Sequence, residues 1–454
     1  MIRGGFWGWV TVLGVFCALD TRASVPIVQG MTDETSTAFA IHWDDSARDA
    51  EHVSVRAFLD EERPRGNASQ PMTPIAPIAT WIQSESFGDT AVVQAVFTGL
   101  NIHQRYRLEV YYKNHRKDRR WFRTLDRSKQ DFRFVMLSCA HDHMHHSDIW
   151  ETVVDQNPDV IFFLGDNVYA DYPYWLPFLR RNPDPEQIWD RYRDTFEELA
   201  FYRSKQLIPV TAIWDDHDFG GNDSDSHYPY RAESMRVFRD FFPQGRRIKA
   251  AVPGGFASHE FGPGVSQAFY AFGRTFIFLD ERSFRNLSPD PKTRTTLGFI
   301  QWDWLERRIR STEGHGFIFG GDQFFGGYHE GDSFEGDDAP GLGRLTRTLA
   351  ESKGRFVLGS GDVHYSEVQA LERALFGYET LEVTSSSIHS FNHGEHEPLD
   401  LHRRRRAFTR HHNFVRADVR TITATNSAPL RSEMTFTSLG GDGETFFVIP
   451  FTLE

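Results

Sequence analysis

The sequence contains only two cysteines in 454 residues, and this scarcity limits how the chain can be held together. Cys17 lies in the apolar amino-terminal segment, so removal of that segment would leave Cys139 alone. A single cysteine forms no internal disulfide, which excludes a disulfide-stapled scaffold. Cys139 follows an apolar run and stands next to His141 and Asp142. We therefore interpret it as a metal ligand rather than as a buried apolar side chain.

Basic residues are fewer than acidic residues. The chain has 50 Lys and Arg against 63 Asp and Glu, a formal net charge of −13. Proteins that bind nucleic acid through its backbone normally carry a basic face, so we expect no sequence-specific nucleic acid binding. The hydrophobic content of 39% and the charged content of 25% are typical of a globular protein. The length exceeds what one core usually holds and predicts two domains.

The amino terminus lacks an apolar run long enough to cross a bilayer comfortably. Gly4 to Ala18, mostly apolar, spans about fifteen residues, against the roughly twenty that a spanning helix needs. A charged start and the small residues around Ala23 predict an export signal over residues 1–24, with an uncleaved membrane anchor as the alternative. We expect a periplasmic or secreted monomer with no stable membrane span after cleavage.

Residues 25–127 show alternating apolar and polar positions without a helical period. Thr37–Trp43, Val53–Phe58 and Arg107–Tyr111 alternate at every second residue. Short strands at this spacing predict an all-β sandwich of about 100 residues, which we interpret as a scaffold. The polar and basic stretch from Lys113 to Gln130 predicts a solvated strand pair and then a linker.

From residue 131 to 454 strands alternate with helices, which predicts an α/β domain with a mostly parallel sheet. Helices are expected at Ser147–Val154, Glu186–Gln206, Ile300–Ile309 and Leu342–Leu349. Thr380–Ser385, Glu433–Thr437 and Thr445–Phe451 are expected to be late strands, with an antiparallel arrangement as one option.

Four apolar strands of this second domain end in polar side chains. They lead into Cys139, His141 and Asp142; into Asp166 and Tyr169; into Asp215, Asp216, His217, Asp218 and Asn222; and into Asp362 and His364. The carboxyl ends of parallel strands meet at one edge of a sheet, where loops converge on a site. Charged groups at such positions are costly in a core unless they are paired. The pattern therefore predicts a metal centre at the sheet edge.

The donor types predict two different cations. Gly165 lets the chain turn so that Asp166 projects over the strand end, where a carboxylate can bridge two ions, and the phenolate of Tyr169 suits a ferric ion. Mixed soft and hard donors argue against a single structural zinc and favour a transition metal beside a harder cation. Two cations about 3.5–4 Å apart can bind an attacking hydroxide and a phosphoryl oxygen. His217, beside Asp216, would stabilise the developing charge or protonate the leaving oxygen.

Several residues near these strand ends have two interpretations. Arg282 would grip a phosphate or form a structural ion pair, and Asp322 would be a ligand or a cap. For Asp215 and Asp218 the alternative to a role in the site is to hold loops. At most one or two residues of the histidine cluster His141, His143, His145 and His146 are expected to touch the site. The arginine run Arg403 to Arg406 is expected to form a solvated loop, with phosphate steering as the alternative.

Taken together, these pieces resemble the alkaline phosphatase D (PhoD-like) family of metallophosphatases and phosphodiesterases. The matching motifs are Ser138-Cys139, Gly165-Asp166 with Tyr169, Trp214-Asp215-Asp216-His217 with Asn222, and Gly361-Asp362-Val363-His364 with Ser366. Supporting pieces are Tyr192-Arg193, Leu279-Asp280 with Arg282-Ser283, Gln301 with Trp304-Leu305, and Thr384-Ser385-Ser386 with His389-Ser390. Asp218 stands where the family usually has Glu.

The resemblance implies a four-layer α/β/β/α metallophosphoesterase domain behind an immunoglobulin-like or fibronectin-like sandwich. It implies ferric iron (Fe3+) held by Cys139, Asp166, Tyr169 and His364. It also implies a second divalent cation near Asp166, Asn222 and Asp362, which is Ca2+ in some relatives, with Zn2+, Mn2+ or Mg2+ as alternatives.

We therefore predict an exported hydrolase of phosphate monoesters or diesters that acts by attack of a metal-bound hydroxide, with His217, Asp216 and Arg282 as catalytic residues. The substrate would be a small or polymeric phosphate ester. Two alternatives stay open. One is a binding protein that keeps the fold without turnover, and the other is a metal-dependent hydrolase of a non-phosphate ester.

Overall fold

The computed structural model describes most of the chain, namely residues 25–44, 47–60, 73–84, 90–172, 182–290, 292–326, 333–391, 403–422 and 430–454. The predicted export signal, residues 1–24, lies outside the described residues. In the part of the chain that is described, no helix has both the length and the apolar character needed to cross a membrane.

The amino-terminal strands form two sheets. The first has the order β1-β2-β5-β4 and the second β3-β6-β7. Their bounds are β1 Ile27–Thr32, β2 Thr37–Trp43, β3 Val53–Leu59, β4 Ala79–Ser84, β5 Ala91–Phe97, β6 Arg105–Tyr112 and β7 His115–Arg123, with the short helix α1 Ala47–Ala50 before β3. One apolar core, which includes Phe39, Val93, Leu108 and Phe122, contains residues of both sheets.

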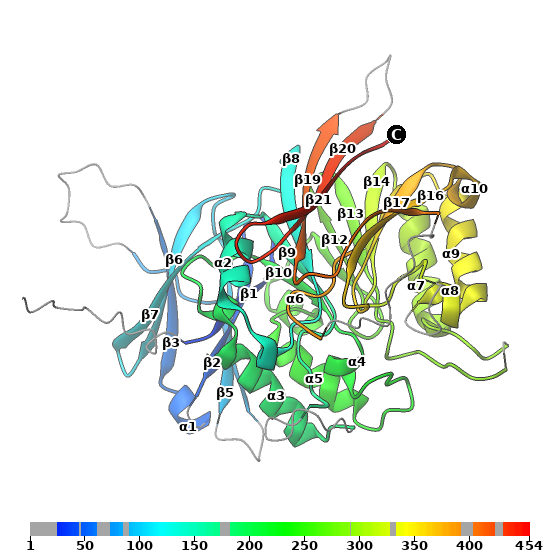
Figure 1. Ribbon diagram of the computed structural model, residues 1–454. Helices are drawn as coiled ribbons and strands as arrows, with labels where there is room; N and C mark the ends of the chain where they lie inside the picture. The colour runs from blue at the N-terminus through cyan, green and yellow to red at the C-terminus, as the bar shows by residue number, and fades with distance from the viewer. Residues whose placement is uncertain are drawn as a thin grey trace, which may run out of the picture.

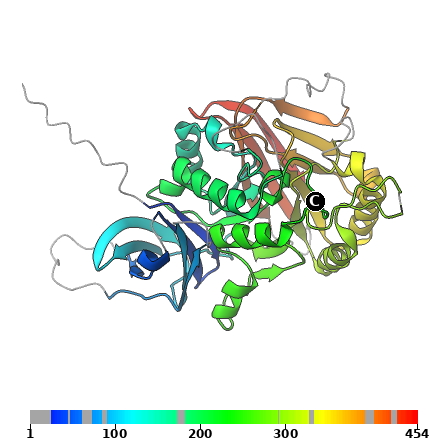
Figure 2. The same ribbon diagram turned by 90° about the horizontal axis from the view of Figure 1, so that it is seen from below.

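Strand β2 is buried on both faces, although its alternating sequence correctly indicated a strand. Phe39 and Ile41 point into the core shared by the two amino-terminal sheets. On the opposite face the ring of His42 stacks on Phe241 at 6.0 Å, and its Nδ1 lies 2.7 Å from Glu197 Oε1. The first sheet therefore packs against helices of the following region, as Figure 2 shows.

The remaining strands form a six-stranded and an eight-stranded sheet, with the orders β10-β9-β8-β19-β20-β21 and β11-β12-β13-β14-β15-β17-β16-β18. The first comprises β8 Asp131–Leu137, β9 Val160–Leu164, β10 Val210–Ile213, β19 Phe414–Ile422, β20 Arg431–Leu439 and β21 Thr445–Leu453. The second comprises β11 His259–Phe261, β12 Gln267–Ala271, β13 Arg274–Phe278, β14 His315–Phe319, β15 Arg355–Ser360, β16 Ser366–Leu371, β17 Thr380–Thr384 and β18 Arg405–Thr409.

The six-stranded sheet is parallel in one half and antiparallel in the other, whereas the eight-stranded sheet has a parallel centre and antiparallel edges. Strands β8, β9 and β10 pair in parallel, and so do β13, β14, β15 and β17. The strand expected at Thr380–Ser385 is thus parallel to β15 and antiparallel only to β16. The two last strands, β20 and β21, are antiparallel. The fold is mixed α/β, as predicted.

Helices lie on the outer sides of the two large sheets. Figure 1 shows α7, α8 and α9 beside the eight-stranded sheet, and α2, α3 and α5 on the side of the six-stranded sheet. The bounds are α2 Ser147–Asp155, α3 Pro185–Glu198, α4 Asp216–Phe219, α5 Arg231–Phe241, α6 Arg246–Ala251, α7 Gly298–Ser311, α8 Phe334–Asp337, α9 Ala339–Glu351 and α10 Arg373–Phe376, with 3-10 turns η1 Asp142–Met144 and η2 Ala200–Arg203.

Because successive side chains of a strand point to opposite faces, β8 contributes residues to two different cores. Phe134 and Met136 join the core that also holds Phe276 and Phe317 of the eight-stranded sheet. Val135 and Leu137 face the opposite way, into a core with the apolar residues of α2, α3 and α5. Both faces of β8 are therefore buried along Phe134–Leu137, which is why this part of the strand is a continuous apolar run.

The long helix expected at Glu186–Gln206 is shorter than predicted. Helix α3 ends at Glu198 because Leu199 adopts an extended backbone, with φ −72° and ψ 123°, and residues 200–203 then form a 3-10 turn. The predicted apolar stripe is nevertheless buried, and Trp189, Tyr192 and Phe196 lie in one core with Tyr202.

Candidate metal centre

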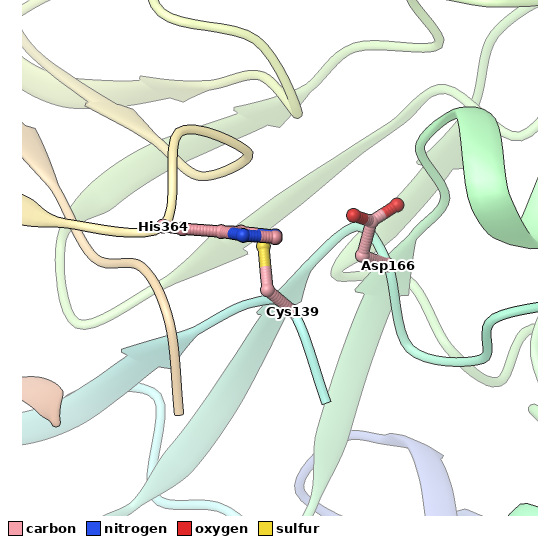
Figure 3. Close-up of side chains that lie close together, drawn as sticks. All are labelled: Cys139, Asp166 and His364. Carbon is pink, nitrogen blue, oxygen red and sulfur yellow. The ribbon is translucent and has the colours of Figure 1, made fainter. Parts of the chain in front are cut away.

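Side chains from both large sheets meet where the parallel strands end. Cys139 follows β8, Asp166 follows β9, and His364 follows β15 of the other sheet. Their donor atoms all lie within 4.8 Å of one another, and all three residues are buried. Figure 3 shows the three side chains together, each on a loop just after a strand. The structure thus brings together ligands that are more than 200 positions apart in the sequence.

Two glycines allow the strand ends to come this close. Gly165 has φ +95°, and a Cβ there would lie 2.5 Å from the Cβ of Asp215. A Cβ on Gly361 would lie 2.7 Å from the Cβ of Ser138 and 2.8 Å from the carbonyl oxygen of Leu164. These distances are too short for any side chain, so both positions require glycine.

The backbone of the candidate ligands is in the left-handed region. The φ angles are 58° at Cys139, 51° at Asp166, 64° at Asp362 and 58° at His364. Each non-glycine residue held there costs on the order of 1–3 kcal/mol, and such residues cluster at functional sites. Four of them where strands of the two large sheets end indicate that the fold orients these side chains at the expense of backbone strain.

Tyr169 completes the set predicted for iron. Its hydroxyl lies 3.0 Å from His364 Nε2 and 2.9 Å from Ser390 Oγ. His364 Nδ1 lies 2.6 Å from the carbonyl oxygen of Phe391, which can only accept a hydrogen bond. The proton is therefore on Nδ1, and the Nε2 lone pair faces the Tyr169 hydroxyl. A metal-binding imidazole commonly donates its other N–H in this way.

The electrostatics of this group favour a bound cation. Burial raises the pKa of the Cys139 thiol and of the Tyr169 phenol well above their usual values, and the Asp166 carboxylate raises both further. Burial is also the main reason that the pKa of Asp166 rises to about 7. Asp166 Oδ2 is buried without a hydrogen-bond partner among the described residues. Sulfur, imidazole, phenol and carboxylate donors with this deficit of positive charge fit a bound transition metal.

Asp166 also belongs to a second group, with Asp216 and His217, whose donor atoms again lie within 4.8 Å. His217 Nδ1 lies 2.7 Å from Asp171 Oδ1. Burial alone would lower the pKa of His217, but Asp216, Asp171 and Asp166 together raise it well above its usual value. The imidazole is therefore held protonated and oriented. Asp171 was not recognised from the sequence, where its only signal is its place two residues after Tyr169.

Asp362 lies in a third group, with Asp215 and Asp322. The carboxylates of Asp215 and Asp322 are bound by Arg282, which is buried, and Asp322 is also bound by Arg285. Of the two interpretations of Arg282, the contacts match the structural ion pair, since its guanidinium donates to carboxylates in the interior. Asp322 is part of the same network rather than a helix cap.

The loop after β10 holds the remaining predicted residues. Asp215 and Asp218 form a reciprocal capping box at α4, and Asp218 also accepts from Asn167 Nδ2 at 2.5 Å, so both stabilise loops. Asn222 is exposed; its amide donates to Asp223 and its main-chain N–H to Asp171 Oδ2 at 3.2 Å. Asp166 and Asp362, expected beside it around one cation, fall in separate carboxylate groups.

Of the histidine cluster, His141 reaches the site. Its buried ring lies 4.5 Å from the Tyr169 ring, and burial lowers its pKa to about 2, so it is neutral. His143 and His146 are exposed. In the arginine run, Arg404 and Arg405 are mostly buried and pair with Glu372 and Glu367, which corrects the solvated loop expected there.

Two serine hydroxyls lie beside the sulfur; both residues stand in the motifs quoted above, but their contact with Cys139 was not predicted. Ser386 Oγ lies 3.1 Å from Cys139 Sγ and accepts from the main-chain N–H of His364 at 2.9 Å. Ser138 Oγ lies 3.2 Å from the same sulfur. The only signal in the sequence is the run of hydroxyl residues after β17, which does not indicate which of them would face Cys139.

Comparison with known proteins gives the same family as the motifs. The family model described as PhoD-like phosphatase matches residues 134–436. The solved structure entitled "Structure of PhoD" is similar over 94% of this chain and 90% of its own, with 17% sequence identity and a TM-score of 0.66. At this identity the similarity establishes the fold alone. No curated protein sequence is similar enough to count as a match.

Proposed function

Because the chain belongs to the PhoD-like phosphatase family, we propose that it is a metal-dependent phosphoesterase that hydrolyses small or polymeric phosphate monoesters or diesters. The observation that carries this proposal is the group formed by Cys139, Asp166 and His364, whose donor atoms lie within 4.8 Å in the interior. A thiol, a carboxyl and an imidazole gathered this closely in the interior are hard to explain as a structural core.

The donor types decide how two cations would be divided. Cys139, Asp166, Tyr169 and His364 would hold Fe3+, which accepts thiolate and phenolate donors. A second divalent cation, Ca2+ in the first instance, would lie on the side of Asp166 that faces Asp216, with Asn222 and Asp362 as its further proposed ligands. Zn2+, Mn2+ and Mg2+ are the alternatives. Bound cations supply Lewis acidity, which neutralises phosphate oxygens and makes water more acidic.

The protein's own residues would handle the leaving group. His217 is protonated, buried and oriented through Nδ1 by Asp171. It stands next to Asp166 and Asp216, so it is placed to give a proton to an ester oxygen as the bond to phosphorus breaks. Arg282 holds Asp215 and Asp322 in position, and in this proposal it acts through those carboxylates rather than on the phosphate.

The arrangement of layers supports the same assignment. We infer a four-layer α/β/β/α catalytic domain from residue 131 and an amino-terminal all-β sandwich over residues 25–127. The support is the pair of large sheets that share one core and the pair of small sheets that share another. Export through residues 1–24, followed by action outside the cytoplasm as a monomer, is part of the proposal and rests on the sequence.

The test is the Asp166→Asn variant. Because Asp166 is the residue shared by two groups of donors, its replacement should remove bound metal and lower kcat/KM by more than about 100-fold. About 100-fold is the largest loss expected for a residue that only hydrogen-bonds to a metal ligand, so a greater loss indicates a ligand. Elemental analysis and a panel of phosphate monoesters and diesters measure both effects, and the panel also reports which ester class is preferred.

Asp159→Asn is the matched control, because Asp159 stands at the opposite end of β9, where it pairs with Lys129 at 2.7 Å. It should keep the metal and the activity. Undiminished hydrolysis by Asp166→Asn, or a purified parent protein with neither metal nor esterase activity, would refute the proposed function.

A further inference from the structure

A large cavity lies outside the metal centre. Its volume is about 1040 Å³, and helices α5 and α6, the turn at residues 262–264 and the start of α7 line it (Figure 1). None of the residues assigned above to the metals or to catalysis lines it. The cavity therefore needs its own explanation.

Arginines dominate the wall of this cavity. Five of them contribute, against a single acidic residue, Asp240; they are Arg231, Arg236, Arg239, Arg246 and Arg247. This gives the wall an excess of positive charge in a chain whose formal net charge is −13. Asp240 lies near Arg236 and Arg247, so the other three arginines are the ones to explain.

Arg231, Arg239 and Arg246 are held by main-chain carbonyls of the same wall. Arg239 Nη2 donates to Gly264 at 2.6 Å, Arg246 Nη2 donates to Phe261 and Gly262 at 2.8 and 3.0 Å, and Arg231 donates to Ser226. Within the described part of the chain, no carboxylate lies at ion-pair distance from any of these three. A guanidinium has five N–H donors, so each keeps donors for a ligand.

Arg239 and Arg246 are also close enough to repel each other. Burial lowers the pKa of Arg239, and the charge of Arg246 lowers it further, with Asp280 acting in the opposite sense. Asp280 outweighs the repulsion from Arg246, but it does not line the cavity, so the wall itself keeps its positive charge. An anion between the two guanidinium groups would relieve the repulsion, and Arg pairs with phosphate oxygens through two parallel hydrogen bonds.

The rim adds an apolar surface. Phe299 is 80% exposed and Ile300 is 62% exposed, and both stand in the first turn of α7 at the cavity. Met235 and Phe284 line the wall nearby. An inorganic anion would leave this surface unused, whereas a phosphate that carries an apolar group would cover it.

We propose that this cavity is a second binding site, separate from the metal centre, for an organic phosphate with an apolar substituent. Arg231, Arg239 and Arg246 bind the phosphate oxygens, and Phe299 and Ile300 pack on the apolar part. This inference does not depend on the proposed function, because none of the metal-centre residues takes part.

Phenylphosphonate is a suitable probe because its carbon–phosphorus bond is not an ester and is not hydrolysed. Isothermal titration of the full chain should show one binding site more than the Arg239→Gln/Arg246→Gln variant shows. Loss of two charge-assisted contacts should weaken that site roughly 100-fold. Arg307→Gln/Arg310→Gln, which removes two exposed arginines from α7, is the matched control and should bind like the parent.

Met235→Glu is a second variant that keeps every arginine. Its carboxylate would enter the cavity and should abolish the same site by repulsion, while esterase activity stays at the parent level. Titration with inorganic phosphate should be weaker than with phenylphosphonate, since it lacks the apolar part. Cosedimentation with vesicles that contain phosphatidylglycerol then distinguishes a lipid headgroup from a soluble ester as the natural ligand. If the parent binds the vesicles and both cavity variants do not, the ligand is a lipid headgroup; if the parent does not bind them, it is a soluble ester. Equal stoichiometry and affinity in the parent and both cavity variants would overturn the proposal.

Discussion

Replacing Arg282 by Gln separates the two roles that its sequence position allows. The guanidinium is buried and donates to Asp215 and Asp322. Asp322 keeps a second partner, Arg285, but Asp215 pairs with Arg282 alone among the ion pairs of the described residues. In the variant, Asp215 would be a buried carboxylate without a counter-charge, so the effect on stability can be calculated from this one group.

The calculation uses protonation as the limit. Burial drives the pKa of Asp215 upward from its usual 3.8, and Arg282 opposes this rise more than any other group. The bonded guanidinium, whose own pKa Asp215 raises, keeps the carboxylate ionised in the parent, so only without Arg282 does the folded protein bind a proton there. Taking up that proton at pH 7, relative to an unfolded chain with a pKa of 3.8, costs about 4 kcal/mol. This agrees with the roughly 3–5 kcal/mol found when one partner of a buried pair is removed.

The same reasoning gives the sign of the pH dependence. The folded variant holds a proton on Asp215 that the unfolded chain releases above pH 3.8, so the variant gains stability as the pH falls. The deficit relative to the parent should shrink from about 4 kcal/mol near pH 7 to about 2 kcal/mol near pH 5. Urea-induced unfolding followed by tryptophan fluorescence at the two pH values measures it.

Arg308→Gln provides the comparison, since Arg308 pairs with Glu260 at 2.6 Å at the partly exposed surface, where such pairs contribute about 0–1 kcal/mol. A variant Arg282→Gln that is as stable as the parent at both pH values but has lost kcat/KM would contradict the ion-pair interpretation. It would assign Arg282 to the phosphate instead.

Two further predictions test the leaving-group step and acid stability. His217→Asn should lower kcat/KM by about 10²–10⁴-fold for alkyl phosphate esters and by less for nitrophenyl esters, whose leaving oxygen needs no proton. Asp171→Asn should show the same leaving-group bias to a smaller extent, because Asp171 orients His217. Equal losses for both esters would exclude proton donation. His259 is buried, and burial lowers its pKa from 6.5 to about 4, so the folded protein holds it neutral. Below pH 6.5 the unfolded chain therefore binds more protons than the folded protein. The free energy of unfolding should fall by up to about 3 kcal/mol as the pH drops towards 4. The unfolding free energy of His259→Gln should be less steep in that range than that of the exposed-site control His115→Gln, and parallel curves would refute the assignment.

The position of the site could be predicted because strand ends carry most of the information. Cys139, Asp166, Tyr169 and His364 each follow an apolar run, and parallel strands bring their carboxyl ends to one edge. The strand pattern alone predicted one mostly parallel sheet, and that the runs belong to two sheets was expected only from the family resemblance. Only pairing over hundreds of residues, such as that of β19 with β8, reveals this arrangement.

The partners of the charged residues were harder to predict, for a physical reason. A carboxylate at a strand end has the same local signal whether it binds a cation or an arginine, because either neutralises its charge. Asp322 and Asp362 both follow such strands, yet Asp322 pairs with two buried arginines. Asp171, which orients His217, lies in no recognisable pattern, since its role depends on a contact 46 residues away.

Buried acidic groups are neutralised by guanidinium groups in the arginine network, and cations would neutralise them in the proposed metal centre. Asp215, Asp322 and Asp337 obtain positive charge from Arg282 and Arg285. Cys139 instead contacts serine hydroxyls and the main-chain oxygen of Asp362, and the Asp166 carboxylate accepts from the main-chain N–H of His217. In the proposed function, cations would therefore neutralise Cys139 and Asp166, whereas arginines neutralise Asp322. It follows that Arg282→Gln should keep its metal although it loses stability, whereas Asp166→Asn should lose metal.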